Sequence, residues 1–446
     1  MAHVVEGPQF PDNWFVHGKQ TFAQTYAMAA DIRRFLAGAV PSGAAVCLCA
    51  ENKGIVAAAL LATLDGRTPL VIPHSNASHS LQELHCLTGY AAAITDTDRQ
   101  LPPEVAVFSP TPGKEVDGGW APVTAAPTME WLRLYTGGST GTPQVWSKTV
   151  ANIFMEATYL CRVYDIGPHD RIVATVTPNH IYGLLYSVML PLIGSAAVIA
   201  GVPTFPQEIV SAVNENQATV LASVPIHYRI LNGQSPFGKS LRLAFSSAGA
   251  LAPKDGDAFY RQTATPVTEI YGSTETGGIA ARCRAGEDRC FMPFDPIDWK
   301  IKEDRLCIRS AFISAQLPID HEGFFTTPDH VGASGRGFVL KGRSDNVVKV
   351  GGKRVDMERI RESLVGLSGI RDAFVMSAPL TGGRENELIA VVEGDMDEGR
   401  LRGEMTRILE PCEMPRRILT VRRIPTTVAG KYDRKAVAGL FNISAT

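Results

Sequence analysis

The first stretch whose residue types suit chemistry is residues 130–149, where a predicted short buried strand, Trp131–Tyr135, leads directly into a loop of small residues. Three glycines allow the backbone N–H groups of such a loop to converge, and hydroxyl side chains add further donors, so the loop suits a polyphosphate. The candidate ligands are Thr136, Gly138, Ser139, Thr140 and Gly141, with Lys148 as a charge partner. The spacing matches neither usual glycine-rich phosphate motif. Taken alone, the stretch also fits an ordinary surface turn.

A second cluster follows the predicted strand Val267–Ile270. Tyr271 ends this strand and small residues follow, which is where open α/β sheets bind ligands. Within this cluster Glu275 is a hard oxygen ligand suited to Mg²⁺, since hydroxyls and glycines flank it. The alternative is a carboxylate that only caps a helix or a turn.

Two further clusters lie in the C-terminal third of the chain. Thr326–His330 is predicted as a turn and Gly337–Arg343 as a strand that ends on an arginine. Asp329 and Arg343 are residue types suited to binding a sugar diol or a phosphate. An ordinary surface turn beside an arginine at the end of a strand explains the pattern equally well. Lys431 follows a small flexible turn and is suited to entering a cleft, whereas alone it would be an exposed lysine.

The elements that must position these residues alternate between strand and helix. Apolar strands and amphipathic helices follow one another from residue 44 to residue 95 and again from 171 to 270, which predicts α/β architecture with parallel sheets flanked by helices. Residues 102–127 are predicted to be a loop, and Asp298–Ser314 a short, antiparallel β layer. We expect a large domain over residues 1–342 and a small, mobile α+β domain over residues 343–446.

The composition excludes several classes of function. A net charge of −2 and a pI near 6.6 give no electrostatic reason to expect nucleic acid or an anionic membrane as a partner. The uncharged segment Ile181–Pro203 is long enough to span a bilayer, but Pro191 and two glycines divide it into a predicted helix, Tyr182–Leu192, and a strand, Ala196–Ala200. No secretory signal is evident and the cysteines are scattered, so we expect a cytoplasmic protein with reduced thiols.

The four clusters, in this order and at these separations, resemble the adenylate-forming superfamily of acyl- and aryl-CoA synthetases, peptide-synthetase adenylation domains and luciferases. The resemblance implies that the loop at Thr136 holds ATP phosphates and that Lys431 contacts the α-phosphate and the substrate carboxylate. It also implies a hinge at Asp345. The remaining implied contacts are Tyr271 beside adenine, Gly272 with the nucleotide, Thr274 and Glu275 with phosphate and Mg²⁺, and Asp329 and Arg343 with ribose.

The substrate pocket is implied less specifically. His180 resembles the residue that shapes the acyl pocket, but a histidine of the core is an equal alternative. Ala248 and Gly249 lie in a segment that resembles the pocket wall, and their small size slightly favours an aryl acid over a fatty acid. Since no carrier domain follows Lys431, we expect the acceptor to be coenzyme A or a separate carrier protein.

The chain also departs from the family pattern. Gly137 stands where a hydroxyl residue is usual and Gln144 stands where a lysine is usual, which leaves Lys148 as the candidate for the lost charge. The predicted function is therefore ATP- and Mg²⁺-dependent activation of a carboxylic acid as an adenylate, followed by transfer to a thiol. The alternative is a nucleotide-binding member that has lost catalysis. A hydrolase using Ser139 is disfavoured, because a G-x-S-x-G elbow is absent.

Overall fold

The computed structural model describes residues 2–112, 120–136, 144–234, 236–283, 290–343, 347–350, 353–379, 386–409, 411, 413–427 and 430–443. These residues form two compact units. The first takes in the described residues up to 297 together with residues 309–318, and the second takes in residues 298–308 and the described residues from 319 onward. The predicted boundary after residue 342 therefore lies within the second unit.

The larger sheet of the first unit has nine strands. From β13 to β1 neighbouring strands run parallel, and β14, β15 and β2 extend the sheet with antiparallel pairing. In spatial order the strands are β15 (Met292–Pro293), β14 (Gly277–Cys283), β13 (Val267–Ser273), β12 (Leu243–Ser246), β11 (Val220–Ser223), β9 (Arg171–Ala174), β10 (Ala197–Val198), β1 (Trp14–Val16) and β2 (Gln20–Thr21).

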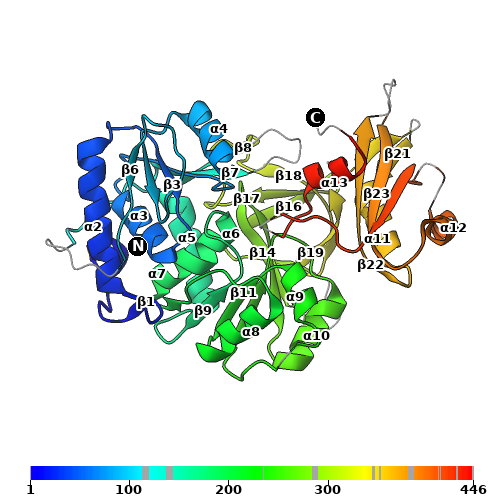
Figure 1. Ribbon diagram of the computed structural model, residues 1–446, viewed down its shortest axis with the longest axis horizontal. Helices are drawn as coiled ribbons and strands as arrows, with labels where there is room; N and C mark the ends of the chain where they lie inside the picture. Colours follow the sequence, from blue (N-terminus) through cyan, green and yellow to red (C-terminus); the bar gives the residue numbers. More distant parts are fainter. Residues whose placement is uncertain are drawn as a thin grey trace. The chain divides into compact units, whose positions relative to one another are not determined.

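Three helices cover the green part of this sheet in Figure 1: α8 (Pro206–Glu215), α9 (Pro225–Leu231) and α10 (Pro253–Thr263). Each begins with a proline, whose fixed φ and missing N–H suit the first turn of a helix. Their apolar faces and the strands share one buried core, which includes Leu221, Tyr228 and Phe259. The helix–sheet packing thus fixes the carboxyl ends of the parallel strands in one row.

The second sheet of this unit has six strands, parallel except for β8. Its strands in spatial order are β6 (Ala106–Phe108), β5 (Ala92–Thr95), β3 (Val46–Cys49), β4 (Leu70–Ile72), β7 (Glu130–Thr136) and β8 (Gln144–Thr149). The accompanying helices are α1 (Ala2–Glu6), α2 (Phe22–Ala39), α3 (Lys53–Ala62), α4 (Ser78–Thr88) and α5 (Val150–Val163). The prediction of a structureless 102–127 was wrong at β6, because pairing with β5 decides a strand that local periodicity does not indicate.

The uncharged segment after residue 180 folds as short pieces. They are α6 (Ile181–Leu184), a π-helical turn η1 (Leu185–Met189), α7 (Leu190–Gly194) and then β10. Pro191 lies in the first turn of α7, and the strand that follows joins the nine-stranded sheet. Among the described residues no helix combines the length and the apolar character needed to cross a bilayer.

The second unit contains three sheets. The largest runs β16 (Asp298–Lys302), β17 (Arg305–Arg309), β18 (Phe325–Ser334) and β19 (Gly337–Arg343), with antiparallel pairing from β17 to β19. The others are β20 (Val347–Val350) with β21 (Lys353–Asp356), and β22 (Ile370–Pro379), β23 (Asn386–Gly394) and β24 (Arg417–Val421). The helices are α11 (Met357–Val365), α12 (Glu398–Ile408) and α13 (Arg434–Leu440). The predicted α/β class, with an antiparallel layer and a small α+β part, is confirmed.

Candidate active site

The predicted phosphate loop is flanked by an antiparallel strand pair. Thr136 ends β7, Gln144 begins β8, and the two residues are register partners. The Thr136 hydroxyl donates to the Gln144 carbonyl at 3.4 Å. The loop therefore begins and ends at two paired residues of β7 and β8. Four predicted ligands, Gly138, Ser139, Thr140 and Gly141, lie outside the described residues, as does the predicted hinge residue Asp345.

The turn that connects β13 to β14 carries Thr274 and Glu275. It is closed by Ser273 and Thr276: the Ser273 N–H donates to the Thr276 hydroxyl at 3.0 Å, and the Thr276 N–H donates to the Ser273 hydroxyl at 3.3 Å. Thr274 and Glu275 are half-buried at the tip. Among the described residues the Glu275 carboxylate has no hydrogen-bond partner, so its oxygens are available to a cation.

Tyr271 and Gly272 precede this turn at a bulge in the β13–β14 pair. Tyr271 is half-buried, and its ring lies 5.5 Å, centroid to centroid, from that of Phe291. A Cβ on Gly272 would lie 2.3 Å from the Gly277 carbonyl oxygen. Glycine is therefore required at position 272 by the close approach of the two strands, whether or not a nucleotide binds there.

Lys148 lies elsewhere than expected. Its side chain is only 1% exposed, and its ammonium group donates to the carbonyl oxygens of Glu275 at 3.0 Å and Phe312 at 2.7 Å. Two of the three N–H donors of this buried ammonium group are thus engaged by main-chain carbonyls. The assignment of Lys148 as the replacement for the missing loop lysine stays a prediction, and its burial and these two bonds argue against it.

Glu156 is a charged residue that the sequence did not single out. It lies in α5, is 3% exposed and accepts a hydrogen bond from the Gly278 N–H at 2.7 Å. Burial raises the pKa of its carboxyl group, and the positive charge of Lys148 opposes that rise. Burial has the opposite effect on Lys148 and lowers the pKa of its ammonium group, and the negative charges of Glu156 and Glu275 oppose that fall. The two side chains thus form a buried pair of opposite charges.

Asp329 and Arg343 are brought together as expected. They are register partners on β18 and β19, and the Arg343 Nη1 lies 3.4 Å from the Asp329 Oδ1. Asp329 is 7% exposed, and its N–H donates to the Thr327 hydroxyl at 3.2 Å. The prediction of a turn at residues 326–330 was wrong, because these residues belong to β18, which pairs with strands on both sides.

Lys431 is exposed and belongs to the second unit. Its carbonyl accepts from the Thr427 N–H at 2.7 Å, and an isolated bridge joins Thr426 to Tyr432. Gly430, immediately before the lysine, has a φ of 73°, which favours glycine. These bonds close a small turn at the position predicted for the lysine.

The residues predicted to line the acyl pocket lie near the carboxyl ends of the parallel strands. Ala248 and Gly249 are exposed just after β12, and Ala248 has a φ of 69°, an unusual value for a residue with a Cβ. His180 is half-buried at the start of α6. The structure adds a polar chain at this edge that the sequence analysis missed: the Thr175 hydroxyl lies 2.8 Å from both the Ser223 Oγ and the His227 Nδ1.

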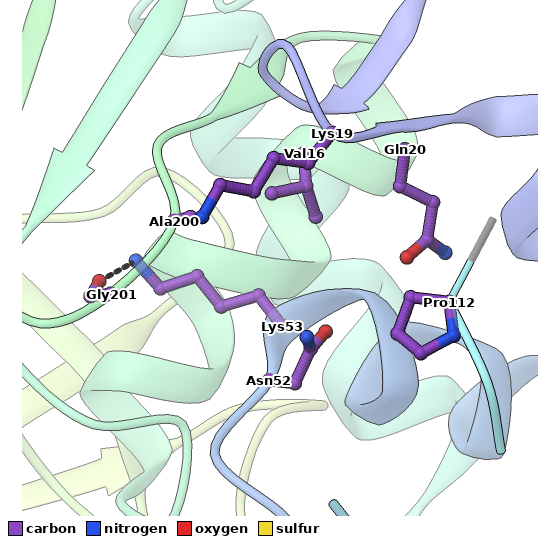
Figure 2. A pocket seen from close by; sticks show the side chains of 8 residues that line it. All are labelled: Val16, Lys19, Gln20, Asn52, Lys53, Pro112, Ala200 and Gly201. Carbon is purple, nitrogen blue, oxygen red and sulfur yellow. Dashed lines mark hydrogen bonds between the residues drawn. The ribbon is translucent and has the colours of Figure 1, made fainter.

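A cavity of about 210 Å³ lies apart from all of these residues, within the first unit (Figure 2). It is lined by Val16, Lys19, Gln20, Asn52, Lys53, Pro112, Ala200 and Gly201. Lys53, which begins α3, reaches across it to donate to the carbonyls of Ile199 at 2.8 Å and Gly201 at 2.7 Å. None of the predicted site residues lines this cavity, so we assign Lys53 a structural role between the two sheets of the unit.

Burial lowers the pKa of Lys53 to about 7, which predicts a pH dependence of stability. Between about pH 7 and the pKa of 10.5 of the unfolded chain, the unfolded state holds a proton that the folded state lacks. The free energy of unfolding of the wild-type protein should therefore rise with pH in this window, relative to a Lys53→Met variant, by up to about 1.4 kcal/mol per pH unit. Denaturant unfolding of both proteins at several pH values from 7 to 10 measures this difference.

A Lys19→Met variant is the matched control, because Lys19 is an exposed lysine at the rim of the same cavity. Its free energy of unfolding should follow the wild-type pH profile. Parallel profiles for the wild type and the Lys53→Met variant would contradict the prediction.

The comparisons with known proteins agree with the fold just described. Two α/β sheets in one unit, with a polar turn at the carboxyl end of β13, form the arrangement in which open α/β proteins bind their ligands. The model of the family "AMP-binding enzyme" matches residues 6–308. The match covers more than half of the chain, and the protein belongs to this family.

Two relatives and one solved structure illustrate the range of the resemblance. The chain is 25% identical over 342 residues to a sulfoacetate–CoA ligase of Cupriavidus necator (69% of this chain, 66% of the relative) and 26% identical over 352 residues to an acetyl-coenzyme A synthetase of Methylorubrum extorquens (68% and 54%). It thus spans between about half and two thirds of the length of these relatives. ATP-bound MatB from Rhodopseudomonas palustris has the same fold, with a TM-score of 0.82 at 18% identity and coverage of 97% and 96%.

Proposed function

We propose that this protein uses ATP to activate a carboxylic acid as an acyl adenylate and then transfers the acyl group to a thiol. The observation that carries the proposal is the pair Asp329 and Arg343, in register and 3.4 Å apart on adjacent strands. A carboxylate that accepts from two hydroxyls beside a guanidinium is suited to the ribose of a nucleotide. Membership of the AMP-binding family and the names of the two relatives support the same reaction.

The reaction needs groups that bind the triphosphate of ATP and groups that stabilise the negative charge that develops during the reaction. A carboxylate oxygen attacks the α-phosphorus of ATP, the bond to the β-phosphate bridging oxygen breaks, and pyrophosphate leaves. A thiol sulfur then attacks the carbonyl carbon of the adenylate, loses its proton, and AMP leaves as the thioester forms. In the first step Lys431 would place its ammonium beside the α-phosphate and the carboxylate, stabilising the charge that builds on their oxygens.

The turn after β13 fits a divalent cation that arrives with the nucleotide. Mg²⁺ is usually held by one or two carboxylates together with phosphate oxygens and water. Glu275 offers one carboxylate without a hydrogen-bond partner among the described residues, and Thr274 adds a hydroxyl beside it. When bound, Mg²⁺ neutralises phosphate charge and favours departure of pyrophosphate. Glu275 would orient this cation, and Tyr271, three residues before Thr274, would pack beside the base.

For the acid we propose an aryl carboxylate over a fatty acid. Ala248 and Gly249 follow β12 with no bulky side chain, which leaves width for a flat ring near the carboxyl ends of the strands. His180 and His227, both half-buried, add groups able to bond a ring substituent. For the acceptor we propose coenzyme A or the pantetheine thiol of a separate carrier protein.

Carboxylate-dependent exchange of pyrophosphate into ATP tests the proposal. Purified protein with Mg²⁺ is offered aryl, short aliphatic and long-chain acids in separate reactions, and exchange is expected only with particular acids, strongest among the aryl acids. Reactions without an acid serve as controls. Exchange with no acid of the panel would contradict the proposal, and stronger exchange with fatty acids would contradict its aryl part alone.

A second candidate function is nucleotide binding without chemistry. It is favoured by the position of Lys148, because Gln144 stands exposed at the end of the phosphate loop and the lysine expected to compensate is buried elsewhere. Calorimetry that detects ATP binding, combined with no adenylate from any acid, would favour this candidate over the ligase.

A further inference from the structure

The main chain of the turn that carries Glu275 is hydrogen-bonded to both members of the buried charge pair, Lys148 and Glu156. Lys148 Nζ donates to the main-chain carbonyl of Glu275 at 3.0 Å. Glu156 Oε1 accepts from the N–H of Gly278, three residues further on, at 2.7 Å. One pair of opposite charges therefore holds the main chain both at Glu275 and just after it.

The two charged side chains come from one rigid corner of the first unit. Lys148 is the last residue but one of β8, and Glu156 is half-way along α5, the helix that follows directly. A capping box fixes the corner between them: the Asn152 N–H donates to the Thr149 hydroxyl at 3.1 Å, and the Thr149 N–H donates to the Asn152 Oδ1 at 2.9 Å. The helix start is thus set by local bonds, which leaves little freedom in the spacing of the two charges.

A third segment, residues 309–318, joins the same arrangement. Lys148 donates its second bond to the Phe312 carbonyl at 2.7 Å, and the Ser314 N–H donates to the Glu275 carbonyl at 2.8 Å. The Glu275 carbonyl therefore accepts two hydrogen bonds, one of them from a charged donor. Charge-assisted bonds are the stronger kind, so Lys148 is the principal anchor of this main-chain group.

The main chain after the turn lies directly against the Glu156 carboxylate. A Cβ on Gly277 would be 2.6 Å from Glu156 Oε2, and a Cβ on Gly278 would be 3.0 Å from Glu156 Oε1. No side chain fits between the carboxylate and the turn. Because the Glu156 carboxylate lies directly against the main chain of the turn, removal of a charge from the pair acts on that main chain itself. No flexible side chain lies between the two to absorb the change.

We infer that Lys148 is a positioning residue for Glu275, acting through the Glu275 main-chain carbonyl, and that Glu156 supplies the charge that keeps the ammonium group buried there. The inference rests on the proposed function in taking Glu275 as the Mg²⁺ ligand. Lys148 was expected to contact a phosphate of the nucleotide directly. In the inferred role it acts indirectly, by holding the residue that would bind the cation.

The expected effect of removing the anchor follows from this geometry. In a Lys148→Met variant the Glu275 carbonyl keeps only its bond from the Ser314 N–H, and Phe312 loses its charged donor. The turn is then free to shift, and groups that orient a metal ligand typically change metal affinity by about 10- to 100-fold when they are lost. The Mg²⁺ concentration for half-maximal activity should rise by that factor, with little change in the KM for ATP at saturating Mg²⁺.

The experiment titrates Mg²⁺ in two readouts on the full-length protein, pyrophosphate exchange and calorimetric ATP binding. Since Lys148→Met leaves Glu156 buried without its partner, a double variant, Lys148→Met with Glu156→Gln, removes both charges and so leaves no uncompensated charge buried. Both variants should need more Mg²⁺ than the wild type. Lys53→Met is the matched control, because it also removes a buried lysine that holds two main-chain carbonyls, but far from this turn in the sequence.

The outcomes separate the two proposals. An unchanged Mg²⁺ requirement in the double variant, or an equal rise in the Lys53→Met variant, would overturn the positioning role. Mg²⁺-stimulated ATP binding without exchange in the wild type would overturn the ligase function alone, and the binding titration would still decide the role of Lys148. Wild-type protein whose ATP binding does not respond to Mg²⁺ would overturn both.

Discussion

Replacement of Lys431 by alanine is expected to lower carboxylate-dependent pyrophosphate exchange by about 10²- to 10³-fold, the usual loss when one donor to a charged transition state is removed. The lysine is exposed and lies in a small turn held by main-chain bonds, so its side chain adds little to stability. The folded protein and its affinity for ATP should therefore be almost unchanged. Exchange kinetics at saturating ATP, together with thermal unfolding, measure both expectations.

Lys435→Ala provides the matched control for this prediction. Lys435 is an equally exposed lysine four residues further on, in α13, and its replacement should leave exchange at the wild-type rate. If the Lys431→Ala variant retained wild-type exchange, the role proposed for this lysine in the adenylation step would be withdrawn.

Replacement of Glu275 by glutamine is expected to lower exchange by about 100-fold or more at limiting Mg²⁺. A glutamine keeps the size and one oxygen of the side chain but removes its charge, and a cation that stabilises the transition state contributes several kcal/mol. Because the carboxylate has no hydrogen-bond partner among the described residues, the substitution breaks no hydrogen bond within that part of the chain. Excess Mg²⁺ should restore part of the exchange. Titration of Mg²⁺ at fixed ATP gives the result directly.

Glu215→Gln controls for the loss of one negative charge, since Glu215 is exposed at the end of α8 and takes no part in the proposed site. Its Mg²⁺ titration should coincide with that of the wild type. A Glu275→Gln variant with the same titration curve would remove the basis for placing Mg²⁺ at this turn, and with it the reason for Lys148 to act as a positioning residue.

The sequence by itself was sufficient for the fold class and for the order of the clusters. Strand–helix alternation can be read from local periodicity, which is clear in the sequence from residue 171 to residue 270. The strands predicted there belong to the nine-stranded sheet. The pairing of Asp329 with Arg343 was also within reach, because a predicted strand ended on the arginine. The same local reasoning failed for residues 326–330 and for β6, where pairing with neighbouring strands decided the structure.

What only the tertiary structure decided is which charged groups are buried and what they hold. A lysine near the end of a strand is expected to be exposed, and nothing near Lys148 in the sequence indicates otherwise. Its two carbonyl partners are 127 and 164 residues away, and the N–H bound by Glu156 is 122 residues away. Lys53 is a similar case, with partners 146 and 148 residues distant. Residue types fix what a side chain can bond, but burial and partners depend on contacts between distant segments, which form only when the chain folds.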